Sequence, residues 1–239
     1  MNDEKTHRLR ALILQHEDPT PPGYVTDWLN AHDAEAETYR IDREEREVDP
    51  TRYDVIVSLG SEFAAFDDTK PFVLREATLM RRAVDSDVPV LGLCFGGQML
   101  ARVLGSDLYR SERSEIGWLP VRTADPELVP EGPWFQWHFD TFTPPPGATV
   151  VADTDVGPQA FVAGRSLGLQ FHPEVTTEIM DEWVRVYRHE LDGDGVDPDA
   201  LLEETRRLAA ASRENALQLF ERYLRDVARL EPADHRVAE

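Results

Sequence analysis

The sequence predicts an α/β protein with a doubly wound, mostly parallel sheet, an antiparallel extension of that sheet, and C-terminal helices. Three observations lead to this fold class. Short apolar runs alternate with helical patterns in the N-terminal half, which favours parallel strands covered on both faces. The middle of the chain carries short strand-like segments separated by Gly and Pro. A helical period then returns after Glu178.

The first strands are three short apolar runs rich in branched side chains, a composition typical of buried parallel strands. They occupy residues 8–14, 53–60 and 88–93. Between them, apolar positions at helical spacing predict a helix over 25–32. A second helix is expected from Pro71, after a cap at Asp68 or Thr69.

The middle region contains five short segments that resemble strands, each bounded by Gly or Pro. We expect them to extend the sheet with antiparallel strands, because short connections suit antiparallel neighbours. The segments are residues 115–123, 132–142, 148–154, 159–164 and 166–172.

Two helices complete the predicted fold. They cover about 180–191 and 199–230, and the second is expected to bend near 209–213. We find no repeat and no low-complexity linker, so the sequence favours a single domain over 1–239. Its core is expected to end near residue 190, with 191–239 as a helical cover.

Composition and charge exclude several function classes. The net charge of −21 makes non-specific attraction to nucleic acid or to an anionic membrane unfavourable. The N-terminal apolar run is too short for a signal peptide or a membrane span, so we expect a cytoplasmic protein. A single cysteine cannot form an internal disulfide.

That cysteine, Cys94, lies in the segment VLGLCFGGQML, at a junction between a strand and a helix. Glycines at 92 and 96 complete a G-x-C-x-G pattern, which allows the sharp turn of a nucleophile elbow. The turn would also place the sulfur at a helix N-terminus, which favours a thiolate. The alternative is a buried cysteine that acts as a small hydrophobe, but core packing does not require glycine on both sides.

The segment GLQFHPEV supplies a base for such a nucleophile and a group to orient it. A strand is expected to end in His172, and Glu174 follows two positions later. Residues two apart in an extended segment face the same way, so the carboxylate of Glu174 can reach the imidazole of His172. A cysteine nucleophile needs this combination.

Taken together, PVLGLCFGGQ and GLQFHPE, with VSLGSE before them and WHFDTF between them, resemble the class I glutamine amidotransferases. The similarity is greatest to stand-alone members related to the amidotransferase domain of GMP synthase, and it covers about 8–190. It implies a flavodoxin-like sheet and a triad of Cys94, His172 and Glu174. It also implies release of ammonia from glutamine through a γ-glutamyl thioester, with no metal or organic cofactor.

The resemblance assigns further roles. It implies that Gln98 contacts the substrate glutamine, and that the backbone N–H groups of Gly60 and Phe95 form an oxyanion hole. It places His138 and Asp140 near the site as structural or recognition groups. The EIGW segment at 115–118 is also family-like, but the sequence assigns it no role.

Four residues depart from the family pattern. Leu59 and Ser61 stand where the oxyanion loop has its first glycine and its proline. Gly97 stands where many members have histidine, and Phe139 replaces the glycine of a His-Gly-Asp motif. We expect none of these changes to abolish activity, because the triad and Gln98 are present.

The acidic segment 192–204 suggests a calcium-binding loop, but its details contradict one. An EF-hand loop needs an oxygen ligand at its fifth place and glycine at its sixth, where this chain has Val196 and Asp197. A turn followed by a helix cap at Asp197, before Pro198, is the better interpretation. We therefore expect no metal.

The acceptor of the ammonia is not identified by the sequence. The segment of 239 residues has no phosphate-binding loop and no room for a synthetase domain beside this fold, so we expect an acceptor on a separate synthetase subunit. Two alternatives remain open: hydrolysis of γ-glutamyl amides or peptides by the same triad, and a non-catalytic regulatory scaffold.

Overall fold

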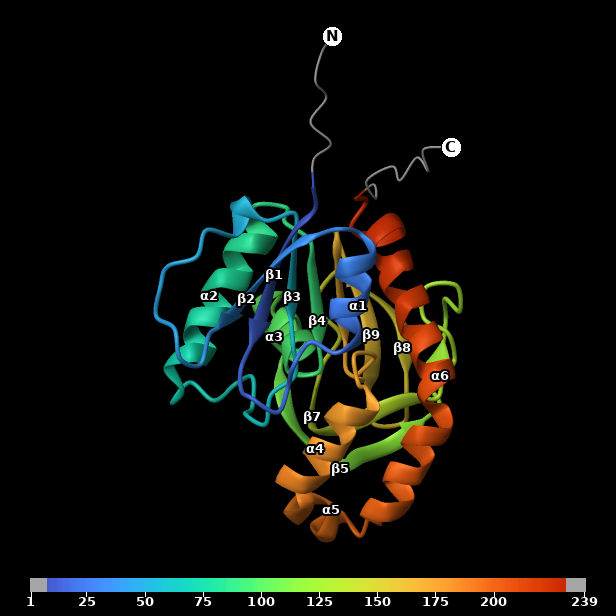
Figure 1. The fold of residues 1–239 in the computed structure, drawn as a ribbon. Helices are drawn as coiled ribbons and strands as arrows, with labels where there is room; N and C mark the ends of the chain where they lie inside the picture. Colours follow the sequence, from blue (N-terminus) through green and yellow to red (C-terminus); the bar gives the residue numbers. More distant parts are fainter. Residues whose placement is uncertain (1–7, 231–239) are drawn as a thin grey trace, which may run out of the picture.

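The central element of the structure is an eight-stranded sheet with the order β2-β1-β3-β4-β10-β9-β8-β6 (Figure 1). The structure, a computed structural model, describes residues 8–230. The parallel strands are β1 (Arg10–Gln15), β2 (Glu35–Arg40), β3 (Val55–Ser58), β4 (Val90–Leu93) and β10 (Ser166–Leu169). This is the flavodoxin-like strand order, so the predicted fold class is confirmed.

The antiparallel extension exists, but its membership differs from the prediction. It consists of β9 (Pro158–Ala163), β8 (Thr149–Asp153) and β6 (Arg122–Thr123). The segment 166–172 was expected in this extension, yet its strand β10 runs parallel to β4 and pairs antiparallel only with β9. All four residues of β10 are buried, which is typical of a strand inside a parallel sheet.

Two predicted members of the extension form a separate sheet instead. β5 (Leu108–Leu119) and β7 (Trp134–Phe142) pair with each other, with a register shift between Arg110 and Glu115. Their long mutual ladder satisfies the backbone groups that the main sheet would otherwise have paired. Only Arg122–Thr123, at the end of the predicted segment 115–123, joins the main sheet.

Helices cover both faces of the main sheet (Figure 1). α2 (Pro71–Asp85) and α3 (Phe95–Val103) pack on one face, and α1 (Tyr24–Ala31) and α6 (Pro198–Arg222) pack on the other. α4 (Thr177–Val186) and α5 (Arg188–Asp194) pack against the β5–β7 sheet in a third apolar cluster. This third cluster lies near the carboxyl ends of the parallel strands.

The helix boundaries correct two expectations. The helix predicted over 180–191 is two helices, because Tyr187 caps both α4 and α5 in a non-helical conformation. The helix predicted over 199–230 ends at Arg222, and a π-helical turn, Tyr223–Val227, follows it. Through 209–213, where a bend was predicted, α6 continues without a break, because this alanine-rich stretch favours helix.

The predicted caps have different outcomes. Neither Asp68 nor Thr69 caps α2: its N-cap is Lys70, with no side-chain hydrogen bond, and Pro71 begins the helix. The cap at Asp197 is confirmed, because its carboxylate accepts hydrogen bonds from the N–H groups of Asp199 and Ala200. The acidic segment is therefore a turn and a helix cap, and no group of three or more potential metal ligands occurs within 8–230.

Two short elements have no counterpart in the sequence prediction. β2 lies at the sheet edge with mostly exposed side chains, so it lacks an apolar run. A 3-10 turn, Pro50–Arg52, precedes β3. Residues 1–7 and 231–239, at the start of the chain and the end of the predicted helical cover, lie outside the described part. Within that part, none of the helices has the length and apolar character that crossing a bilayer requires.

Candidate active site

A pocket opens where the carboxyl ends of the parallel strands meet the β5–β7 sheet and α5. In a doubly wound sheet this edge is the usual location of a ligand site. Five of the eight residues predicted from the sequence line this pocket: Cys94, Gln98, His138, Asp140 and His172. The other three, Gly60, Phe95 and Glu174, lie directly behind them.

Cys94 occupies a strained elbow between β4 and α3. Its backbone has φ +48° and ψ −104°, a region that residues other than glycine rarely adopt. It is the N-cap residue of α3, so its sulfur lies at a helix N-terminus. The side chain is 5% exposed but lines the pocket, which distinguishes it from a cysteine enclosed in the core.

The elbow depends on glycines that bring backbone segments close together. A Cβ atom at Gly92 would lie 2.4 Å from the carbonyl oxygen of Gly96, and one at Gly96 would lie 2.2 Å from that of Ser58. Gly97, a departure from the family pattern, has a similar constraint: its Cβ would lie 2.2 Å from the carbonyl oxygen of Leu169. In this chain a side chain at position 97 would therefore require a backbone shift.

This packing leads to a stability prediction. Gly96→Ala is expected to lower the free energy of unfolding by about 2–3 kcal/mol, because its methyl group overlaps backbone atoms of β3. Gly193→Ala is the matched control: it lies in α5 with open space around its Cβ position, and it should be neutral or slightly stabilising. Urea unfolding measures both. Equal midpoints for the two variants would contradict the prediction.

His172 and Glu174 lie beside the elbow. The strand expected to end in His172 ends earlier, at Leu169, because the chain leaves the ladder there. The N–H of His172 then donates to the carbonyl of Phe135 in β7, at 2.8 Å. Its Nδ1 lies 2.7 Å from Oε1 of Glu174, and both side chains are buried. The imidazole edge also packs against the ring of Trp183.

The electrostatics of His172 follow from these neighbours. Burial acts to lower the pKa of His172, but the Glu174 carboxylate and Cys94 outweigh it and raise this pKa to about 10. The hydrogen bond between Nδ1 and Glu174 leaves Nε2 as the ring nitrogen available to Cys94. The structure therefore brings a sulfur from the junction of β4 and α3 together with an imidazole and a carboxylate from the segment after β10.

The two predicted oxyanion donors lie on either side of this group. A Cβ atom built on Gly60 would lie 3.8 Å from Cβ of Cys94 and 2.8 Å from Cε1 of His172. Within residues 8–230, neither the N–H of Gly60 nor that of Phe95 donates to a protein acceptor. The carbonyl of Leu59 accepts a hydrogen bond from the N–H of Gly96, at 3.2 Å, and this contact links the two donor segments.

Gln98, His138 and Asp140 are grouped at the opposite wall. Nε2 of Gln98 donates to the carbonyl of Asp140 at 3.1 Å and to Oε1 of Gln170 at 3.2 Å. Nδ1 of His138 lies 3.2 Å from the same Asp140 carbonyl. Burial raises the pKa of Asp140, although Arg110 opposes this shift. The side chain of Gln98 is thus already engaged in holding the β7 segment.

The EIGW segment, to which sequence analysis assigns no role, contributes Glu115 to the contacts of His138. Oε2 of Glu115 lies 3.0 Å from Nε2 of His138 and accepts a hydrogen bond from Gln159 at 2.8 Å. Burial alone would raise the pKa of Glu115, but His138 contributes to lowering it below its ordinary value. Glu115 therefore restrains the orientation of the His138 ring through its Nε2 side.

Sequence reasoning missed several residues at the site, and two of them contact residues singled out from the sequence. The buried side chain of Gln170 donates from Nε2 to the sulfur of Cys94, at 3.7 Å. A polar residue inside the apolar run GLQF was the signal for it. Arg110 lines the pocket with its guanidinium 4.4 Å from the ring centroid of Phe139. This contact is the structural consequence of the Phe139 departure.

Comparisons with known proteins agree with this arrangement. In sequence, the chain is 42% identical over 102 residues to a glutamine-hydrolysing GMP synthase of Thermus thermophilus, a match that covers 39% of this chain. The chain spans only 20% of that relative's length. Its fold is similar to the crystal structure of a glutamine amidotransferase from Thermotoga maritima, with a TM-score of 0.83 and 33% identity, covering 91% of this chain and 99% of that one.

A second solved structure, a glutamine amidotransferase from Methylobacillus flagellatus, has a TM-score of 0.85 and 25% identity. It covers 98% of this chain and 100% of that one. The model of the family described as class I glutamine amidotransferase matches residues 26–185, which include the elbow, the His172 segment and most of the residues that line the pocket. With more than half of its length matched, the chain belongs to the class I glutamine amidotransferase family.

Proposed function

We propose that this protein releases ammonia from glutamine through a γ-glutamyl thioester on Cys94. The observation that carries the proposal is the elbow itself: a strained cysteine at a helix N-terminus, beside an imidazole that a buried carboxylate orients. The single domain over 1–239 is part of this proposal. The family membership and the glutamine-hydrolysing relatives support the substrate class.

The proposed chemistry begins with attack of the Cys94 sulfur on the side-chain carbonyl carbon of glutamine. The carbonyl electron pair moves to oxygen, where the N–H groups of Gly60 and Phe95 stabilise the charge. As this intermediate collapses, the C–N bond breaks, and the proton on Nε2 of His172 goes to the leaving nitrogen to give ammonia. The raised pKa of His172 suits this role, because the ring holds a proton at neutral pH.

The second half of the cycle returns the enzyme to its starting state. Water attacks the thioester carbon and gives a proton to His172. Collapse of this intermediate then breaks the C–S bond, restores the thiolate and releases glutamate. Glu174 holds the ring with its Nε2 toward the sulfur throughout. All of these steps use side chains and backbone groups of this chain.

We propose a separate synthetase subunit as the acceptor of the ammonia. One observation favours a second candidate, hydrolysis of γ-glutamyl amides or peptides. A groove of about 610 Å³ adjoins the pocket and shares Glu62, Arg110, Phe139 and Glu190 with it. Such a groove can hold a leaving group larger than ammonia.

The experiment that separates these functions measures glutamate release, with Cys94→Ala as the blank. Turnover of glutamine supports the amidotransferase proposal. Turnover of γ-glutamyl amines or dipeptides with inert glutamine supports the hydrolase. If no candidate substrate is turned over, also when synthetases are added, the protein is a non-catalytic scaffold.

The pocket lining also supports a specific contact with the amino-acid end of glutamine. Arg110 is the only Lys or Arg among the described residues that line this pocket, whereas Glu62, Asp140 and Glu190 supply negative charge. A glutamine whose carboxamide meets Cys94 carries one carboxylate and one ammonium at its other end. We assign the carboxylate to Arg110 and the ammonium to these acidic side chains.

Arg110→Gln is therefore expected to lower kcat/KM for glutamine by about 10- to 100-fold, chiefly through KM. The same variant should leave kcat/KM for 4-aminobutanamide, which lacks the carboxylate, within about threefold of wild type. Arg113→Gln is the matched control, because Arg113 belongs to the adjoining groove and pairs with Asp155. An equal loss on both substrates would contradict the assignment.

A further inference from the structure

A buried polar group lies directly behind the candidate oxyanion hole. Its members are His16, which follows β1, Ser58 at the end of β3, and Glu76 in α2. The three side chains are at most 1% exposed. None of them lines the pocket or takes part in the proposed chemistry.

The contacts of this group form a continuous chain that ends on the oxyanion loop. Oγ of Ser58 donates to Oε1 of Glu76 at 2.5 Å, and Oε2 of Glu76 lies 2.6 Å from Nε2 of His16. Nδ1 of His16 lies 3.1 Å from the carbonyl oxygen of Gly60. A carbonyl oxygen only accepts hydrogen bonds, so Nδ1 carries the proton in this contact.

His16 contacts the second donor segment as well. Its ring packs against the ring of Phe95, with centroids 4.5 Å apart. One buried side chain therefore touches both residues whose N–H groups are the proposed oxyanion donors. Burial alone would lower the pKa of His16, but Glu76 raises it above the ordinary value, which favours a ring protonated on both nitrogens.

The hydrogen bond to Gly60 has a geometric consequence. A trans peptide is planar, so its C=O and N–H groups point in opposite directions. The carbonyl of Leu59 is held by the N–H of Gly96, which fixes the direction of the Gly60 N–H. The carbonyl of Gly60 is held by His16, which fixes the next peptide. Ser61 lacks the fixed φ of a proline at this place, so these two contacts restrain the loop.

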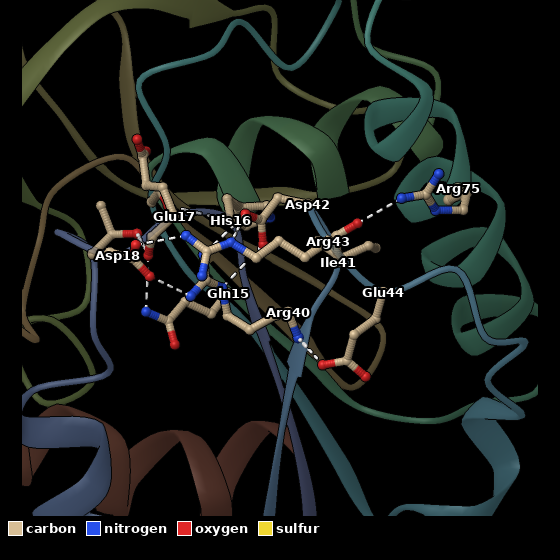
Figure 2. A network of polar contacts seen from close by, with 12 residues as sticks. Gln15, His16, Glu17, Asp18, Arg40, Ile41, Asp42, Arg43, Glu44 and Arg75 are labelled. Atoms are coloured by element: carbon tan, nitrogen blue, oxygen red, sulfur yellow. Dashed lines mark hydrogen bonds and ion pairs between the residues drawn. The ribbon is translucent and has the colours of Figure 1, made fainter.

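The segment that carries His16 is itself anchored on its outer side (Figure 2). Arg40, the last residue of β2, and Arg43, in the loop after it, each donate to the carboxylate of Asp18 at 2.5 Å. Arg75, in the same helix as Glu76, donates to the carbonyl of Ile41 at 2.7 Å. These contacts connect the segment after β1, the loop after β2, and α2 around the buried group.

From this arrangement we infer that His16, held by Glu76 and Ser58, is a positioning residue that, through the Gly60 carbonyl, holds the loop in the conformation in which the Gly60 N–H can donate to the oxyanion. The inference rests on the proposed thioester chemistry. Removal of one oxyanion donor costs roughly 10²- to 10³-fold in rate, and loss of its alignment should cost part of this. Buried ion pairs contribute little net stability, so stability alone does not account for the group.

The test compares two reactions of Cys94. Acylation by glutamine or by p-nitrophenyl acetate creates an oxyanion, whereas alkylation by iodoacetamide displaces iodide and creates none. Cys94 is the chain's only cysteine, so mass spectrometry reports its alkylation directly. His16→Leu is expected to slow acylation about 10- to 100-fold, with KM for glutamine and the alkylation rate each within threefold of wild type.

His16→Asn is the matched variant, because its side-chain amide can replace Nδ1 as the donor to Gly60. It should recover at least a tenfold part of the acylation rate lost in His16→Leu. The single variant His16→Leu leaves Glu76 unpaired and could unfold the chain. In that case the double variant His16→Leu with Glu76→Leu removes both charges, and the same slowing of acylation is expected. The inference would be overturned if His16→Leu, or the double variant, acylates Cys94 at a rate within threefold of wild type. Equal losses in the rates of acylation and alkylation would also overturn it.

The outcomes also separate this inference from the proposed function. If glutamine is inert but the ester acylates Cys94 with the expected dependence on His16, the function is wrong and the inference stands. If glutamine is hydrolysed but His16 affects both reactions equally, the function stands and the inference is wrong. If neither compound acylates Cys94 in the wild type, both are wrong, since no oxyanion site exists.

Discussion

Replacing Cys94 with alanine is expected to abolish glutamate release from glutamine, with kcat at least about 10⁵-fold below wild type. In the proposed mechanism the C–S bond forms in the first half-reaction and breaks in the second, so no other group can replace the sulfur. The residual rate comes only from substrate binding and from the Gly60 and Phe95 donors acting on water. A coupled glutamate assay at high enzyme concentration measures this difference.

A second measurement identifies the intermediate. Wild-type enzyme, quenched with acid during turnover, should carry a γ-glutamyl group on Cys94 that mass spectrometry detects, and Cys94→Ala should carry none. The variant should fold, because alanine accepts the same positive φ as cysteine and only the pocket-facing sulfur is lost. A folded Cys94→Ala that retains more than a tenth of the activity would contradict the thioester.

Replacing His172 with asparagine should lower kcat for glutamine by about 10³- to 10⁴-fold. The raised pKa of His172 means that the ring enters the reaction with a proton for the leaving ammonia. Asparagine cannot shuttle this proton. His189→Asn, an exposed histidine in α5, is the matched control and should leave kcat unchanged.

The leaving group provides a sharper form of this test. γ-Glutamyl p-nitroanilide releases a weakly basic amine, p-nitroaniline. Its cleavage therefore depends less on protonation of the leaving nitrogen than the cleavage of glutamine does. The loss caused by His172→Asn should be at least tenfold smaller on the anilide. Glu174→Gln should follow the same trend with a smaller loss, since it disturbs only the tautomer and orientation of the ring. Equal losses on both substrates would contradict the role of His172 as the acid.

The chain order of the site residues shows what the sequence could reveal. The elbow was predictable because its geometry is local: a strand, two glycines and a helix start all lie within VLGLCFGGQML. The pairing of His172 with Glu174 is equally local. Their approach to Cys94 depends on the parallel pairing of β10 with β4, and the sequence had suggested an antiparallel role for that segment.

The remaining site features come from tertiary contacts that leave weak local signals. His16 stands at the end of an apolar run, where it could equally be an exposed polar residue, and its partner Glu76 lies in a helix that otherwise appears amphipathic. Glu115 and His138 meet only because β5 pairs with β7. The resemblance to a family supplied the roles of Gln98 and the oxyanion loop, which composition and periodicity alone do not give.

Although β10 lies beside β4 in the sheet, the two strands are translated far apart in time. A ribosome makes the thiol-bearing elbow early, then translates all of β5 to β9 before it reaches the neighbouring strand. Throughout that interval the growing polypeptide contains Cys94 but not His172, so under the proposed mechanism a chain truncated before β10 should not release ammonia from glutamine.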